Sequence, residues 1–192
     1  MNRLLLQGAR YHERRSLFVS ADWGEMPDWR ADRHSIRIAL ALRERHGVGP
    51  GDVVALGIPF SARFVLAERA IWGLGASTLP LPQRGVRWKA TIASESECDA
   101  LLEEGGVLDT PERAASFRAF AREVPATAIA SIESGRELRH QDWVREVGSY
   151  LERSGSGERG RRERVPRGEA LLPSRVAVYG CWAEGLATVE FC

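Results

Sequence analysis

The sequence predicts an α/β fold with a mostly parallel sheet flanked by helices. Three observations indicate this class. Short apolar runs that suit buried strands alternate with segments whose apolar residues recur at helical spacing. Glycine and proline stand at many of the boundaries between them. With 192 residues, the chain is also long enough to bury the core of such a domain. Strand–helix alternation is typical of parallel sheets, because the helices of the crossover connections cover the sheet faces.

The clearest strand–helix–strand unit follows a Gly-Pro-Gly turn at 49–51. The apolar run 52–58 predicts a buried strand that is entered from this turn. Ser61 is suited to cap the next segment, whose apolar residues recur at helical spacing. Residues 76–81 then predict a second strand.

The alternation continues along the chain. We expect residues 86–94 to be helical and residues 99–102 to form a short strand. Thr110 and Pro111 predict the start of a helix, because threonine caps helix N-termini and proline suits the first helical position. The further expected elements are a strand at 126–132 and a helix at 141–151.

The domain organisation is expected to be a first α/β subdomain over 1–132 and the start of a second over 133–192. The segment 153–167 is rich in glycine and arginine and lacks apolar periodicity, so it predicts a flexible loop. The residues after it, from an apolar run at 170–173 onward, echo the earlier strand–helix–strand unit and suggest an internal repeat. Because the sequence stops on an apolar strand, at Cys192, we expect a truncated chain.

Composition excludes several functional classes. The formal net charge is +1, which predicts no strong attraction for nucleic acid or for an anionic membrane. No apolar stretch approaches the length of a membrane span. The three cysteines form no CxxC pair and have no histidine at metal-ligand spacing, so neither a zinc site nor a disulfide framework is expected. We therefore expect a soluble protein of the reducing cytoplasm.

The stretch 42–59, continued by 72–81, resembles the early part of the adenylate-forming superfamily. This superfamily includes acyl-CoA synthetases, nonribosomal-peptide adenylation domains and luciferases. Two landmarks carry the resemblance, the turn Gly49-Pro50-Gly51-Asp52 and the pair Gly75-Ala76. The helix expected at 36–42 and the rest of the chain up to about residue 132 fit the superfamily's first subdomain more loosely. The landmarks are architectural, since the turn leads into a core strand and Gly75 lets a helix end close against the sheet.

The resemblance implies ATP-dependent activation of a carboxylic acid, as in fatty acid or secondary metabolism, with ATP or AMP and Mg as cofactors. In that chemistry a carboxylate attacks the α-phosphate, pyrophosphate leaves, and a thiol captures the acyl-adenylate. A lysine-containing phosphate loop and carboxylates for magnesium and ribose are needed. The family's ribose, adenine and catalytic-lysine motifs are absent from the sequence, and Lys89, the single lysine, matches none of them. No catalytic residue is assigned, no metal ligand is assigned, and whether the chain is an enzyme stays open.

One segment has residue types that suit the family's phosphate loop. The candidate phosphate-binding residues are Ser131, Ser134, Gly135 and Arg136. Arg136 stands where the family's lysine could fall. Glu133 and Glu137 count against the assignment, because they bring negative charge beside a triphosphate. The alternative is a plain strand-to-helix connection, with His140 as a helix-start residue.

Three functions therefore remain open. The first is a partial acyl- or aryl-CoA ligase-like protein that does not catalyse activation alone. The second is an interaction module that docks on a complementing adenylating chain or a carrier protein, through an exposed final strand. The third is a divergent small nucleotide-binding domain that uses the 131–136 turn. Self-association of the incomplete sheet is expected in each case.

Overall fold

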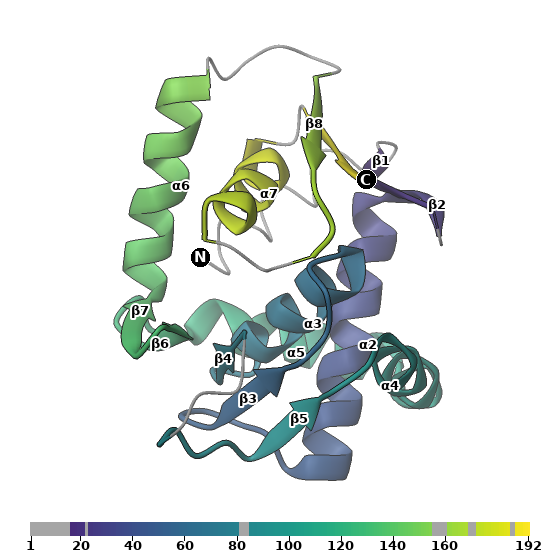
Figure 1. The fold of residues 1–192 in the computed structure, drawn as a ribbon. Coiled ribbons are helices and arrows are strands. Elements are labelled where there is room, and N and C mark those ends of the chain that lie inside the picture. The colour runs from purple at the N-terminus through teal and green to yellow at the C-terminus, as the bar shows by residue number, and fades with distance from the viewer. Residues whose placement is uncertain (1–15, 22, 81–84, 155–160, 169–171, 185–186) are drawn as a thin grey trace.

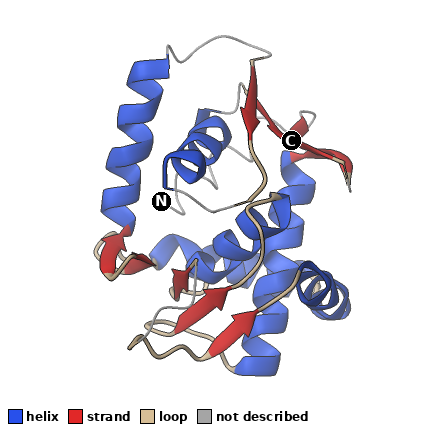
Figure 2. Cartoon of the chain, in the orientation of Figure 1, coloured by secondary structure: helices blue, strands red, loops and turns tan. Residues whose placement is uncertain are grey.

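The computed structural model describes residues 16–21, 23–80, 85–154, 161–168, 172–184 and 187–192. Helices and strands alternate through most of this part of the chain, as the sequence predicts (Figures 1 and 2). In chain order, the elements are β1 (Ser16–Ser20), β2 (Gly24–Pro27), α2 (Asp28–His46), β3 (Val53–Leu56), α3 (Ala62–Gly73), β4 (Ser77–Leu79), β5 (Ala90–Ile92), α4 (Glu95–Leu108), α5 (Pro111–Glu123), β6 (Ile129–Glu133), β7 (Arg136–Arg139), α6 (His140–Ser154), β8 (Arg162–Val165), α7 (Leu172–Glu184) and β9 (Thr188–Phe191).

The larger sheet, sheet B, has the strand order β5-β3-β4-β6-β7. Its first four strands are parallel, and only β7 runs antiparallel to its neighbour β6. Helix α3 packs against β3 and β4, while α2 packs on α3 and α4. Ser61 and Thr110 cap α3 and α5 by accepting hydrogen bonds from the backbone N–H groups of Phe64 and Arg113. The α/β class with a mostly parallel sheet is therefore confirmed.

The smaller sheet, sheet A, has the order β2-β1-β9-β8. It joins the first described strands of the chain to the last ones, since β1 pairs in parallel with β9 through Phe18 and Val189. Strand β9 also pairs in parallel with β8. The prediction of an exposed final strand is therefore wrong: β9 is an inner strand, and β8 and β2 form the edges of the described sheet.

Strand β8 corrects a second prediction. It lies inside the segment 153–167, which is predicted as a flexible loop, and residues 153 and 154 belong to α6. The strand lacks apolar periodicity, and its backbone is instead ordered by the hydrogen-bond ladder with β9. The predicted echo of a strand–helix–strand unit is seen as β8, α7 and β9, but its first strand is β8, and residues 172 and 173 start α7. Residues 155–160 and 169–171 lie outside the described residues.

Two further elements differ from expectation. Residues 90–92, expected in a helix, form β5, which pairs with β3 at the edge of sheet B. Residues 99–102, expected to be a strand, lie in α4. The Oγ of Ser94 accepts a hydrogen bond from the backbone N–H of Glu97 at 3.1 Å and so begins that helix earlier than its short apolar run indicates.

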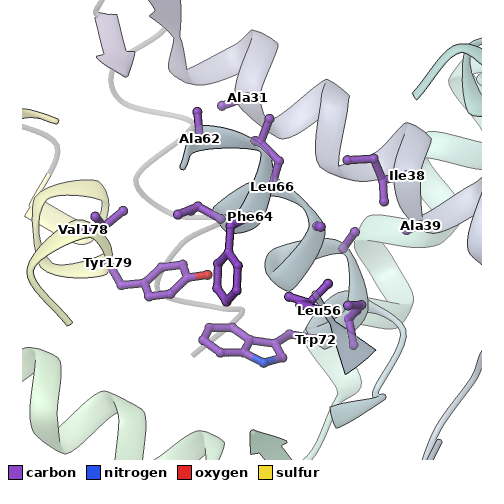
Figure 3. Packing of buried hydrophobic residues seen from close by; sticks show 14 of the residues in the cluster. Ala31, Ile38, Ala39, Leu56, Ala62, Phe64, Leu66, Trp72, Val178 and Tyr179 are labelled. Atoms are coloured by element: carbon purple, nitrogen blue, oxygen red, sulfur yellow. The ribbon is translucent and has the colours of Figure 1, made fainter. Parts of the chain in front are cut away.

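The hydrophobic core is continuous between the two sheets. Figure 3 shows Phe64 and Trp72 of α3 facing Tyr179 of α7, with the ring centroids of Trp72 and Tyr179 4.9 Å apart. On the side of sheet A, Phe18 packs edge-on against Trp182. The expected subdomain boundary between 132 and 133 falls at the end of β6, within the β6–β7 hairpin. No described helix is long and apolar enough to cross a membrane.

Candidate functional site

The candidate phosphate turn is a β-hairpin and not a strand-to-helix connection. Ser134 and Gly135 join β6 to β7 with φ angles of 49° and 83°. Positive φ at two consecutive residues is typical of the tight two-residue hairpin turns whose twist matches that of the paired strands. Glycine suits this conformation, and serine adopts it at some cost in strain. The turn is thus explained by the hairpin alone.

The four candidate residues are only partly brought together. Ser134, Gly135 and Arg136 are exposed at the tip of the hairpin. Ser131 is buried in β6, and its Oγ accepts a hydrogen bond from Trp143 Nε1 at 3.1 Å. Its hydroxyl is therefore engaged in the core, away from the tip.

The two glutamates that count against phosphate binding have different surroundings. Glu137 is exposed on β7. Glu133 forms an ion pair with Arg175 of α7, and the side chain of Arg175 is fully buried. Part of the negative charge beside the turn is thus neutralised by a residue that is distant in sequence.

Arg175 is the centre of a buried polar cluster that the sequence analysis missed. Its guanidinium pairs with Glu68 of α3 as well as with Glu133. Glu68 also accepts hydrogen bonds from the hydroxyls of Tyr179 and Thr78, each at 2.9 Å. We call Glu68, Thr78, Glu133, Arg175 and Tyr179 the Arg175 cluster. A charged pair, Glu68-Arg69, within the apolar run of α3 is the one sequence signal that points to it.

The electrostatics of the cluster are dominated by burial. Burial raises the pKa of Glu68, although the guanidinium of Arg175 opposes this shift. For Arg175, burial acts to lower the pKa, but the carboxylates of Glu68 and Glu133 outweigh it and raise the pKa. Tyr179 has its pKa raised by burial and by the Glu68 carboxylate. The side chains of Glu68, Arg175 and Tyr179 are all engaged with one another inside the core, so the cluster suits a structural role.

A second buried ion network lies next to it on α3. Asp32 of α2 pairs with Arg69 of α3 and with Arg118 of α5, the latter at 2.8 Å. Burial alone would raise the pKa of Asp32, but the two guanidinium groups outweigh it and lower the pKa. The two networks together have three carboxylates and three guanidinium groups, so the buried charge around α3 is balanced.

The two glycine-rich landmarks contact each other directly. The backbone N–H of Gly51 donates to the carbonyl of Gly75 at 3.1 Å. Asp52 closes the turn by accepting a hydrogen bond from the N–H of Gly49 at 2.9 Å. Lys89 donates to the same Asp52 carboxylate at 2.9 Å. The single lysine thus braces a structural turn.

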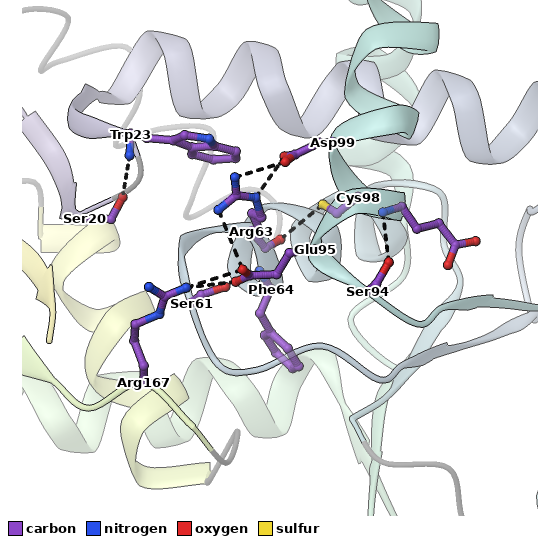
Figure 4. Close-up of polar contacts among 11 residues, drawn as sticks. Ser20, Trp23, Ser61, Arg63, Phe64, Ser94, Glu95, Cys98, Asp99 and Arg167 are labelled. Carbon is purple, nitrogen blue, oxygen red and sulfur yellow. Dashed lines mark hydrogen bonds and ion pairs between the residues drawn. The ribbon is translucent and has the colours of Figure 1, made fainter.

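A surface network joins the segment after β8 to α4 (Figure 4). Arg167 pairs with Glu95 at 3.1 Å, and Arg63 of α3 pairs with Asp99 at 2.8 Å beneath the ring of Trp23. Cys98 lies beside this network, and burial raises the pKa of its thiol to about 12. A thiol with that pKa is unsuited to nucleophilic attack.

The residues present do not fit a magnesium–triphosphate site. Among the described residues, no group of three or more histidine, cysteine, aspartate or glutamate side chains could hold a metal ion. The hairpin tip has one arginine, Arg136, and no lysine. We therefore derive no catalytic step through a bound nucleotide or metal.

No family model matches the sequence, and no curated protein matches it significantly. Solved structures do match. The N-terminal domain of FACL13 from Mycobacterium tuberculosis gives a TM-score of 0.72 at 18% identity, over 100% of this chain and 56% of that chain. O-succinylbenzoate coenzyme A synthetase (MenE) from Bacillus subtilis gives 0.68 at 17% identity, over 98% and 43%. An artificially fused adenylation–PCP di-domain, NpsA-ThdA from Klebsiella oxytoca, gives 0.73 at 13% identity, over 100% and 39%.

The chain therefore has the fold of the N-terminal domains of acyl-CoA synthetases and nonribosomal-peptide adenylation domains. The expected resemblance to adenylate-forming enzymes is confirmed at the level of the fold. The chain spans about half of the length of the solved chains that it matches, or less.

Proposed function

We propose that this chain is the N-terminal framework of an adenylate-forming ligase that activates a carboxylic acid with ATP, and that it does not catalyse activation alone. The observation that carries the proposal is the match of essentially the whole chain to such domains, although it spans only 39% to 56% of the solved chains described above. Its geometry agrees with a scaffold. The glycine landmarks, Lys89 and Ser131 are all engaged in structural contacts.

The remaining chemistry would come from residues outside the described framework. A phosphate-binding lysine, magnesium ligands and a catalytic lysine would be supplied by a further part of the same protein or by a complementing adenylating chain, with a carrier protein as one candidate acceptor. The hairpin tip of Ser134, Gly135 and Arg136 stays a candidate for a minor phosphate contact. ATP or AMP and magnesium are the ligands that this proposal implies.

An interaction role is favoured by one specific observation. Strand β8 is an edge strand of the described sheet A, and edge strands present backbone groups that a further strand can pair with. We propose this edge, in place of the final strand, as the surface where a complementing chain would continue the sheet.

Nucleotide binding by the isolated chain is the decisive measurement. We expect no detectable heat when ATP or AMP is titrated with magnesium at millimolar concentration into protein whose fold has been checked by circular dichroism. Saturable binding that is lost in a Ser134→Ala, Gly135→Pro double variant would contradict the proposal and favour a small nucleotide-binding domain. An Arg145→Ala variant, changed at an exposed position of α6 outside the hairpin, should behave as the wild type does.

A further inference from the structure

The Arg175 cluster joins the two halves of the fold. Arg175 and Tyr179 come from α7, between the two strands β8 and β9 of sheet A. Their partners lie on the other side: Glu68 of α3, which bonds both Arg175 and Tyr179, and Glu133 of β6, which pairs with Arg175. Thr78 of β4 donates to Glu68 and holds that carboxyl group in place. Both carboxylate oxygens of Glu68 thus accept hydrogen bonds from side chains of α7.

Other links between α7 and sheet B are of a different kind. The aromatic contact of Tyr179 with Trp72 is apolar and involves no charged group. The partly exposed pair of Arg167 with Glu95 joins the segment after β8 to α4 and does not involve α7. Arg69 of α3 lies over the ring of Trp182 at 4.7 Å, but its charge is already paired with Asp32. Helix α7 also packs closely on α6. The Arg175 cluster is its charged, directional contact with α3 and β6.

Loss of one partner from such a cluster has a predictable consequence. Without the guanidinium of Arg175, the fully buried carboxyl group of Glu68 and the partly buried one of Glu133 would lose their cation. An uncompensated buried charge is strongly unfavourable, whereas the same charge is well solvated once water reaches it. Movement of α7 is the way to admit water that costs the least free energy. Helix α3 is held by its packing on β3 and β4, and β6 is held by its pairing within sheet B.

We infer that the Arg175 cluster is a latch that holds α7 closed over sheet B, and that breaking it opens α7 while the half built on sheet B stays folded. The latch acts through Arg175, because the ion pairs of Arg69 and Arg118 are both with Asp32 of α2. This inference does not depend on nucleotide binding.

The cysteines of the chain provide the test. Cys181 is buried in α7, Cys98 is buried in α4, and Cys192 is exposed. The rate at which N-ethylmaleimide modifies each thiol in the native full chain is followed by mass spectrometry of digested samples. In Arg175→Met we expect Cys181 to react faster, on the order of 100-fold or more, with Cys98 nearly as slow as in the wild type. Arg118→Met is the control, in which Cys181 should gain no preference over Cys98.

Two results would overturn the latch. Equal acceleration at Cys98 and Cys181 in Arg175→Met would mean that the whole fold had been loosened, and no acceleration at Cys181 would mean that the cluster does not hold α7. If Arg175→Met does not fold, Tyr179→Phe decides the question, because it removes only the hydroxyl that donates to Glu68 and keeps the ring. A rise of roughly 10-fold at Cys181 alone is then expected, and an unchanged or uniform rate rejects the latch.

Discussion

His140 is buried as a neutral ring at the start of α6. Burial lowers its pKa to about 3 from 6.5, and neither ring nitrogen has a hydrogen-bond partner among the described residues. Burial, together with Arg30 and Arg37, lowers the pKa of His34 to about 4. The unfolded chain binds a proton at each histidine near pH 6.5, whereas the folded chain does not. Stability is therefore complete above that pH and falls as the pH decreases toward 3.

We expect the free energy of unfolding to fall on acidification by up to about 1.4 kcal/mol per pH unit for each of these histidines. His140→Phe keeps a ring against Trp72, removes two unpaired nitrogens, and should flatten the pH dependence without loss of stability at pH 7. Urea unfolding at pH 7 and pH 5 measures both effects. If the free energy of unfolding of the variant depends on pH as strongly as that of the wild type, His140 is not the titrating group.

The sequence shows the residue types of the candidate site, but it does not show which residues contact them. Glu133 is expected to repel a phosphate because its charge can be seen in the sequence. Its partner Arg175 cannot be predicted, because the two residues are 42 positions apart and meet through tertiary packing. For the same reason, the buried hydrogen bond between Ser131 and Trp143 is invisible in a run of small and polar residues.

Among the elements, α4 and α2 make the closest backbone approach that the structure describes at a glycine. A Cβ added at Gly105 would lie 1.9 Å from the carbonyl oxygen of Arg37 in α2. A Cβ added at Gly106 would meet only the end of the Arg37 side chain, at 3.9 Å. Position 105 therefore has no room for a Cβ, because it lies against the backbone of α2. Position 106 has room for one, because only the end of a side chain lies near it.

Gly105→Ala is expected to destabilise the protein by about 1–3 kcal/mol or more, since backbone must move to admit the methyl group. Gly106→Ala, its matched control, should be neutral or stabilising by about 0.5–1 kcal/mol, because alanine favours the helix. Thermal and urea unfolding of the two variants measure the difference. Equal stabilities would show that α4 does not lie against α2 at this distance.

The elements that the sequence predicts correctly have local signals. Ser61 and Thr110 mark helix starts that the structure confirms, because capping depends on neighbouring residues. The elements that it misses depend on distant partners. Strand β5 is ordered by β3 and strand β8 by β9, so neither needs an apolar pattern of its own.

For the whole molecule, the order of strands in sheet A decides which substitutions are tolerated. The backbone N–H groups of Thr188 and Cys192 bond to the carbonyls of Arg161 and Val165 in and beside β8. By alternation, the N–H of Val189 faces β1, and the N–H of Arg164 faces away from β9.

Val189→Pro should therefore cost about 1–3 kcal/mol or more of stability, because proline removes a ladder hydrogen bond from an inner strand. Arg164→Pro, on the edge strand, should cost less. Urea unfolding of the two variants compares them directly. The reverse order would show that β8, and not β9, is the inner strand.

The pairing of β1 with β9 also determines when sheet A can form during synthesis, because β1 is translated long before β9. Strand β1 leaves the ribosome long before its partner exists, by roughly ten to thirty seconds at ordinary rates of elongation. Sheet B can assemble during that interval, since its strands lie between those two points. The apolar face of the β1–β2 hairpin is uncovered in the meantime, so we expect the nascent chain to bind chaperones until β9 is translated.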